Sequence, residues 1–167
     1  MDETRERLRE GAAAESAGPR GAAGAAAQVE LHGFLLGEEE YAIDILEVKE
    51  IIRLQPITAV PRSLDWIRGI VTLRGVIVPI FDLRRRLGLP PGEAGPETRI
   101  VVAARGGEPA GLVVDRITQV LRVPHDRVEP PPHTIAAAEA EYLRGVARLE
   151  DRLVILLNLA RVLETAP

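Results

Sequence analysis

The side chains that could perform chemistry are few in this chain of 167 residues, and they are widely spaced. Its three histidines, His32, His125 and His133, lack the H-E-x-x-H spacing that places two metal ligands on one helix face. Cysteine is absent, which excludes disulfides, thiolate metal ligands and a cysteine nucleophile. The two serines, Ser16 and Ser63, lie outside any G-x-S-x-G motif. We therefore expect no metal site and no catalytic nucleophile.

The carboxylates show no catalytic pairing in the sequence. Asp44, Asp82 and Asp115 each stand at the end of a predicted strand, where aspartate commonly forms a turn or a helix cap. Gly106-Gly107 lacks the lysine and hydroxyl residue of a phosphate-binding loop. Because no nucleophile, base and oxyanion donor converge, the sequence favours a protein that is not an enzyme and needs no cofactor. A small hydrolase on a β-barrel scaffold remains the alternative, since distant carboxylates could meet in the fold.

Composition indicates a globular protein with a buried core, because 46% of the residues are hydrophobic and 28% are charged. A formal net charge of −4 and an aromatic content of 3% argue against a nucleic-acid-binding barrel, which needs a basic groove and stacking rings. The one basic cluster, Arg84-Arg85-Arg86, is interpreted as the favourable positive end of a short helix. No apolar run approaches the ~20 residues of a membrane-spanning helix.

Residues 1–28 are predicted to form a disordered N-terminal tail, and residues 29–167 the folded domain. Met1–Gly11 alternates acids with arginines, unlike the apolar centre of a signal peptide. Ala12–Gln28 is rich in alanine and glycine and cannot bury enough apolar area to offset the entropy cost of ordering. A helical docking arm at Thr4–Glu10 is the alternative.

From Leu31 onward, apolar runs of a few residues alternate with turn signals, which indicates a mostly β protein. The strands fall into two groups of five, divided near residues 89–96. The clearest hairpin joins Ile70–Leu73 to Val76–Ile80 through Arg74-Gly75. Pro79 in the second run predicts an edge strand or a bulge, because proline donates no ladder hydrogen bond.

Short helices are predicted between the strands. Asp44 and Glu47 resemble a capping box that begins a short helix, in which Ile45, Val48, Ile51 and Ile52 would share a face. Asp82 and Asn158 are expected to cap two further helices, the second at the C-terminus. Two more segments are assigned by composition: Ile57–Val60 as a strand and Ala136–Tyr142 as a helix.

Five short strands match the size of a small closed barrel, and closure removes exposed sheet edges. The predicted fold is therefore mostly β, with two five-stranded barrels, short connecting helices and a C-terminal helix. Each half of about 60 residues would be marginally stable alone. We expect the barrels to share an apolar interface, and strands could be exchanged between them.

Two stretches are more specific than their periodicity, namely Tyr41–Ile51 (YAIDILEVKEI) and Ile67–Leu83 (IRGIVTLRGVIVPIFDL). Together with Gly111–Asp115, Glu141–Val146 and Leu153–Asn158, they resemble the CheW family of chemotaxis coupling proteins. The resemblance covers about residues 31–164. It implies that the two barrels are SH3-like.

The resemblance also implies a function without catalysis. The protein would be a cytoplasmic adaptor, recruited to receptor arrays at the inner face of the cell membrane. There it would link the cytoplasmic tip of methyl-accepting membrane chemoreceptors to the regulatory domain of a CheA-type histidine kinase. A coupling protein of a non-flagellar pathway, in surface motility or in a second-messenger branch, is an alternative of the same class.

Matching the family's motif implies a receptor-binding surface formed by Val48, Glu50, Ile51, Gly69 and Arg74. Apolar side chains would supply buried area for a helical receptor tip, and the charged ones would orient it. The opposing interpretation is that Val48 and Ile51 face their own barrel and that Gly69 meets a backbone requirement.

The kinase-binding surface is expected on the apolar segment Ile57–Pro61, through Ile57 and Val60. The alternative for this segment is an ordinary barrel strand.

Overall fold

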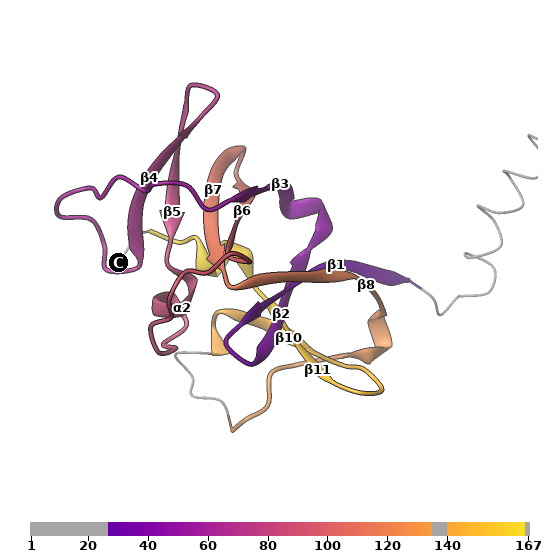
Figure 1. Ribbon diagram of the computed structural model, residues 1–167. Coiled ribbons are helices and arrows are strands. Elements are labelled where there is room, and N and C mark those ends of the chain that lie inside the picture. The colour runs from indigo at the N-terminus through magenta and orange to yellow at the C-terminus, as the bar shows by residue number, and fades with distance from the viewer. Residues whose placement is uncertain (1–26, 135–139, 166–167) are drawn as a thin grey trace, which may run out of the picture.

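Alternating apolar and polar residues build a mostly β fold within residues 27–134 and 140–165, the part of the chain that the computed structural model describes. One sheet has the order β8 (Arg116–Pro124), β1 (Gln28–Leu36), β2 (Glu39–Asp44), β11 (Leu153–Leu157), β10 (Leu143–Arg148), β9 (Val128–Glu129). The other has the order β3 (Val48–Arg53), β6 (Arg99–Arg105), β7 (Glu108–Val114), β5 (Val76–Phe81), β4 (Ile67–Leu73). Figure 1 shows the two curled sheets packed against each other, which confirms the predicted two-barrel fold.

The two halves of the chain repeat one topology. In each half a hairpin (β1–β2 or β6–β7) precedes a further strand (β3 or β8), a second hairpin (β4–β5 or β10–β11) and a one-turn helix. These helices are α2 (Leu83–Arg86) and α4 (Leu159–Val162), and each follows the last strand of its half. The glycine-containing bulges also correspond, because the register shifts between Ile67 and Gly69 in β4 and between Leu143 and Gly145 in β10.

Each barrel takes its first hairpin from the opposite half of the chain. Hairpin β6–β7 pairs with β3 and β5, whereas hairpin β1–β2 pairs with β8 and β11. The boundary predicted near residues 89–96 therefore separates the two halves along the chain but does not separate the sheets. The sequence analysis allowed an exchange of strands between the barrels, and the structure has this exchange. We call the two units the five-stranded barrel and the six-stranded barrel.

Three local predictions were wrong. The helix that begins at Asp44 is a single 3-10 turn, η1 (Ile45–Glu47), because Val48–Arg53 pairs with β6 as a strand. Strand pairing supplies more hydrogen bonds here than continuing the short helix, and tertiary context commonly overrides such a local signal. Asp44 nevertheless caps the turn, since its side chain accepts from the Leu46 N–H.

The segment Ile57–Val60 forms one isolated bridge, Thr58 to Ile70, instead of a strand. Pro79 lies in β5, an interior strand flanked by β7 and β4, and not at an edge. The ladder from β5 to β7 includes only Ile80 and Phe81, so no donor is required at Pro79. The predicted disordered tail lies outside the described residues except at its last two positions, and most of the predicted helix Ala136–Tyr142 also lies outside them.

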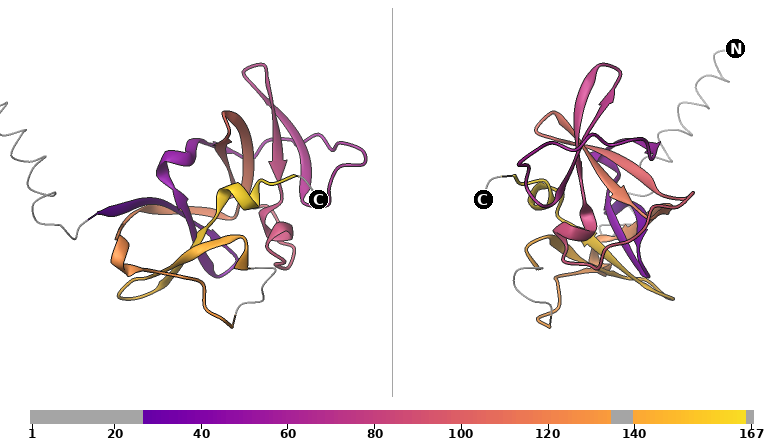
Figure 2. Two further views of the ribbon diagram at one scale, coloured as in Figure 1. Left: turned by 180° about the vertical axis from the view of Figure 1, so that it is seen from behind. Right: turned by 60° about the vertical axis from the view of Figure 1, so that its left-hand side comes forward.

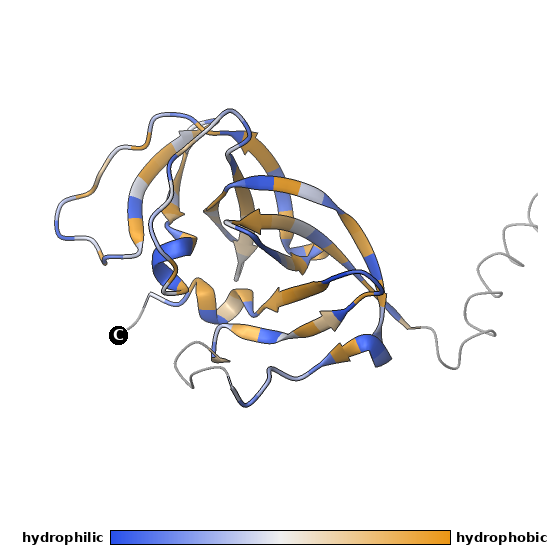
Figure 3. Ribbon diagram, turned by 60° about the horizontal axis from the view of Figure 1, so that its bottom comes forward, coloured by the Kyte–Doolittle hydropathy of each residue, from blue (hydrophilic) through white to orange (hydrophobic). Residues whose placement is uncertain are grey.

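Three apolar clusters stabilise this arrangement. Each barrel has its own core, with Val71, Val78 and Ile100 in the five-stranded barrel and Leu31 and Val154 in the six-stranded one. A third cluster, the shared core, contains buried residues of both sheets and both helices, among them Phe34, Leu36, Tyr41, Ile43, Phe81, Leu83, Val101, Leu112, Leu157, Leu159 and Val162. Alternation along β6 sends neighbouring side chains to different cores, so its central residues are apolar on both faces of the strand. Figure 3 shows the apolar stretches of the strands in orange.

Candidate interaction site

The hairpin β4–β5 carries the most exposed predicted residue. It rises away from the barrels as a narrow loop (Figures 1 and 2), with Arg74 at its turn. Arg74 has a φ of 48° and a side chain that is 73% exposed, as expected for a contact residue in a tight turn. Its guanidinium forms an ion pair with Glu50 of β3, so the hairpin tip is tied to the strand at the other edge of the same sheet.

A groove with a volume of about 340 Å³ adjoins this ion pair. Its polar rim contains Lys49, Glu50 and Arg74, and its other lining residues are Leu73, Val76, Val78, Val102, Gly107 and Pro109. Val76 is 51% exposed, and Ile77 beside it is 62% exposed. An apolar groove with a charged rim is suited to docking an apolar side chain of a partner protein.

The structure does not bring all the predicted receptor residues to this groove. Val48 and Ile51 are half-buried and pack against the shared core, whereas Glu50 lines the groove. Strand geometry explains the separation, because a register shift between Val48 and Glu50 interrupts the regular alternation of β3. Both apolar residues therefore have a packing role in their own fold.

Gly69 is buried in β4, where a bulge brings another chain segment close. Thr58 and Ile70 exchange two backbone hydrogen bonds, of 3.0 and 2.8 Å. A Cβ atom at Gly69 would lie 2.7 Å from the Thr58 carbonyl carbon, and the φ of 150° is itself unfavourable for other residues. Gly145 occupies the matching position in the other barrel, where a Cβ would lie 2.5 Å from the Glu129 carbonyl oxygen. The geometry supports a backbone requirement at Gly69.

The predicted kinase residues lie on the connection between β3 and β4. Ile57 is half-buried and packs against the core of the five-stranded barrel. Val60 is 39% exposed, so its side chain is available to a partner. Only Val60 of this pair presents a free apolar surface.

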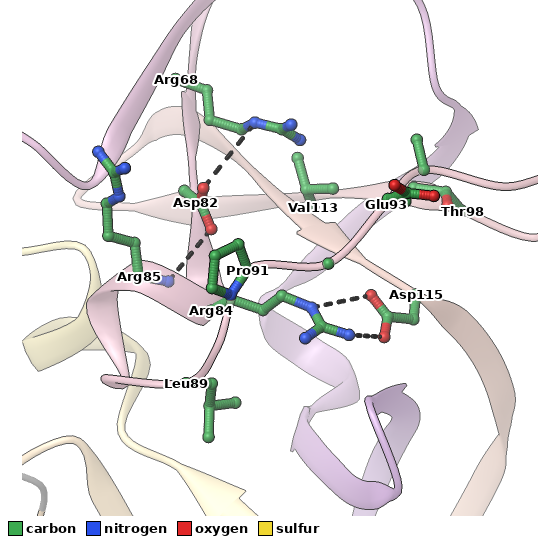
Figure 4. A pocket seen from close by; sticks show the side chains of 12 residues that line it. Arg68, Asp82, Arg84, Arg85, Leu89, Pro91, Glu93, Thr98, Val113 and Asp115 are labelled. Carbon is green, nitrogen blue, oxygen red and sulfur yellow. Dashed lines mark hydrogen bonds and ion pairs between the residues drawn. The ribbon is translucent and has the colours of Figure 1, made fainter.

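A second pocket, of about 170 Å³, lies between α2, the connection after it and the end of β7 (Figure 4). Its arginines and aspartates make hydrogen bonds or ion pairs. Arg84 forms an ion pair with Asp115 and donates to the Pro90 carbonyl oxygen at 2.8 Å. Asp82 accepts from the Arg85 backbone N–H at 3.1 Å and lies 4.0 Å from Arg68. Asp115 also accepts from the Gly37 N–H at 2.7 Å.

These pairings decide the protonation state of Asp115. Burial alone would raise its pKa, but the hydrogen bonds from Arg84 and Gly37 and the positive charge of Arg84 together lower the pKa below the ordinary aspartate value. A general acid needs the opposite shift. Within the described residues no cluster of histidine and carboxylate groups could hold a metal ion. The contacts around the pocket therefore hold α2, the connection after it and the end of β7 together. The carboxylates at the strand ends act as caps and ion-pair partners.

Sequence reasoning missed the role of the arginine cluster. The three arginines do not form a diffuse positive patch, because each contacts a different part of the fold. Arg84 contacts Asp115 where the chain passes from β7 to β8, and Arg85 donates to the Asp65 carbonyl oxygen at 3.2 Å. Arg86 reaches the C-terminal helix and two aromatic rings. The run of three arginines was visible, but their partners lie far away in sequence.

Two packed barrels with an exposed apolar groove and a charged rim are the architecture of a protein-interaction scaffold. Residues 30–166 match the CheW-like domain family. The chain belongs to this family and is a scaffold or adaptor of the CheW type in chemotaxis, which indicates a non-catalytic role.

Individual relatives agree with this assignment. Chemotaxis protein CheW of Klebsiella aerogenes is 36% identical over 132 residues, covering 79% of this chain and 80% of that protein. Protein FrzA of Myxococcus xanthus is 33% identical over 147 residues, covering 87% and 91%. The crystal structure of the scaffolding protein TtCheW from Thermoanaerobacter tengcongensis superposes with a TM-score of 0.75 at 32% identity, covering 81% of this chain and 88% of that one.

The Gly69→Ala substitution is expected to lower the free energy of unfolding by about 2–4 kcal/mol, because the new methyl group collides with the Thr58 carbonyl group. Urea titration followed by circular dichroism measures this loss. Gly95→Ala is the matched control, since a Cβ there meets nothing within 4 Å. If Gly69→Ala has the same free energy of unfolding as the parent protein, the close approach of Thr58 to Gly69 does not contribute to stability.

The Asp115→Asn substitution is expected to lower the stability at pH 7 by about 1–2 kcal/mol, after allowance for partial solvent screening. Because folding lowers the pKa of Asp115, its carboxylate stabilises the native state above the unfolded pKa, and that contribution is lost as pH falls through the folded pKa. The stability difference between parent and variant should thus shrink below about pH 4. Chemical denaturation across pH values tests this, and a constant difference would exclude the ion pair as its cause.

Proposed function

We propose that this protein couples the cytoplasmic tips of membrane chemoreceptors to a CheA-type histidine kinase, as a passive adaptor in chemotaxis. Membership of the CheW-like family supports the class of function. The observation that carries the specific proposal is the exposed apolar groove with the Glu50–Arg74 ion pair at its rim. No described helix has the length and apolar character to cross a membrane. Binding to the cytoplasmic tips of the receptors would place the adaptor at the inner face of the membrane.

The receptor surface would centre on Glu50 and Arg74. A receptor tip is a helical hairpin, and its apolar side chains would enter the groove beside Val76 and Val78. The exposed guanidinium of Arg74 would fix the orientation of the receptor through charge complementarity. Val48 and Ile51 would contribute indirectly, because their packing against the shared core holds β3, and hence Glu50, in place. Gly69 would contribute by allowing β4 to meet the Thr58 segment.

The kinase surface would lie on the connection between β3 and β4. Val60 offers the exposed apolar side chain, and Ile57 would anchor this connection on the barrel core. An apolar contact of this size stabilises a complex only as part of a larger interface. The kinase's regulatory domain, expected to share this fold, would supply the complementary surface.

Replacing Arg74 by Asp is expected to weaken co-sedimentation with a receptor cytoplasmic fragment by about tenfold or more, because the rim then carries two acids instead of an ion pair. The melting temperature should change by less than about 3 °C, since the side chain is largely exposed. Arg53→Asp, at the exposed end of β3, the strand that carries Glu50, is the charge-matched control.

The exchanged pair Glu50→Arg with Arg74→Glu separates two explanations. Recovery of binding would show that the ion pair itself matters, whereas continued loss would show that the receptor contacts Arg74. Normal receptor binding by Arg74→Asp would refute the proposed surface.

Val60→Asp is expected to reduce kinase binding by about tenfold while receptor co-sedimentation stays at the parent level, because it places a charge in an apolar contact. Isothermal titration with the kinase regulatory domain measures the effect. Val120→Asp, at a similarly exposed valine of β8, is the control. Equal kinase affinity for the parent and Val60→Asp would exclude this segment.

A further inference from the structure

Arg86 extends from α2 towards the six-stranded barrel. Its guanidinium carbon lies 4.1 Å from the centre of the Trp66 ring and 4.9 Å from the centre of the Tyr142 ring. Trp66 directly precedes β4 in the five-stranded barrel, and Tyr142 directly precedes β10 in the six-stranded barrel. One cation therefore contacts an aromatic ring from each barrel, an arrangement that favours a charge between π faces.

These two rings occupy corresponding places in the two halves of the chain. The Trp66 carbonyl oxygen accepts from the Asp82 N–H at 2.7 Å, and the Tyr142 carbonyl oxygen accepts from the Asn158 N–H at 2.8 Å. Asp82 and Asn158 are the caps of α2 and α4. Each ring is thus fixed to the start of its own helix, and Arg86 lies where the two halves meet.

The same guanidinium binds the end of α4. It donates to the carbonyl oxygens of Val162 at 3.1 Å, Arg161 at 3.2 Å and Glu164 at 2.7 Å. Carbonyls at a helix end lack partners within the helix, and Arg86 supplies a donor to the Val162 oxygen. The Arg161 oxygen also accepts from the Glu164 N–H at 3.2 Å, so there the guanidinium adds a second donor. The corresponding residue in α4 is Val162, whose side chain has no hydrogen-bond donor. The side chain at this position therefore links the two helices only from α2.

The shared core presses the barrels together but does not by itself set their angle, because apolar attraction is non-directional. A planar fork of donors aimed at three fixed carbonyls is directional. We propose that Arg86 is a positioning residue that sets the angle between the two barrels by joining α2 to α4 and Tyr142. It thereby orients the six-stranded barrel relative to the barrel that carries the Glu50–Arg74 groove.

The test uses the full chain without any partner, so its outcome is independent of the proposed function. The natural sequence has no cysteine, and spin labels can therefore be placed at Ile77→Cys and Leu153→Cys, exposed positions on the matching strands β5 and β11. Electron–electron distance measurements then report the angle between barrels. Fluorescence of Trp66, the one tryptophan of the chain, reports contact with the residue at position 86.

Arg86→Met is expected to shift and broaden the label-to-label distances, to change the Trp66 emission, and to lower the melting temperature by about 2–6 °C. Arg86→Lys keeps the positive charge but loses the planar set of guanidinium donors. Its Trp66 emission should therefore lie closer to that of the parent protein than its label-to-label distances do. Arg122→Met on the exposed face of β8 is the control and should leave all three measurements unchanged.

Tyr142→Leu removes the ring of the six-stranded barrel and keeps an apolar side chain. It should broaden the distances as Arg86→Met does, and it carries the test if Arg86→Met fails to fold. Folded Arg86→Met protein with altered Trp66 emission but parent-like distances would overturn the proposal, as would parent-like distances in Tyr142→Leu.

Discussion

The apolar core shared by the two barrels is the constraint on which the rest of the structure depends. Each half of the chain donates its first hairpin to the other half's barrel, so neither barrel is complete without both halves. The exchanged strands have two apolar faces, one for a barrel interior and one for the shared core. In β6, for example, Ile100 and Val102 face one core while Val101 and Ala103 face the other. Burial on both sides couples the folding of the barrels.

Polar groups at the boundary between the barrels form directional contacts, which apolar packing does not provide. Asp115 stands where the chain leaves β7 for β8, and it joins α2 to the turn after β1 through Arg84 and Gly37. Arg86 joins the same helix to α4. The partly buried Asp44 and Glu47 occupy the other crossing, from β2 to β3, where burial and then the charge of Asp44 raise the pKa of Glu47. Arg84, Arg86 and Asp115 thus link elements of the two barrels by directional contacts.

An adaptor of this kind acts through the geometry of its surfaces. The groove beside Glu50 and Arg74 combines exposed apolar area with a charged rim, and the hairpin that carries it is anchored by the close approach of Gly69 to Thr58. The residues predicted to bind the receptor and the kinase consequently divide into two kinds. Glu50, Arg74 and Val60 present surface, whereas Val48, Ile51, Ile57 and Gly69 hold that surface in place.

Local sequence patterns determined most of the strands, the tightest hairpin turn and the residues that cap the helices. The Arg74-Gly75 hairpin and the caps Asp82 and Asn158 could be predicted because their signals lie within a few residues. Tertiary structure alone decided the exchange of hairpins, the strand at Val48–Arg53 and the partners of Arg84 and Arg86. Each of these depends on contacts between residues far apart in the chain, and the energy of such contacts exceeds the weak preferences that a short stretch of sequence expresses.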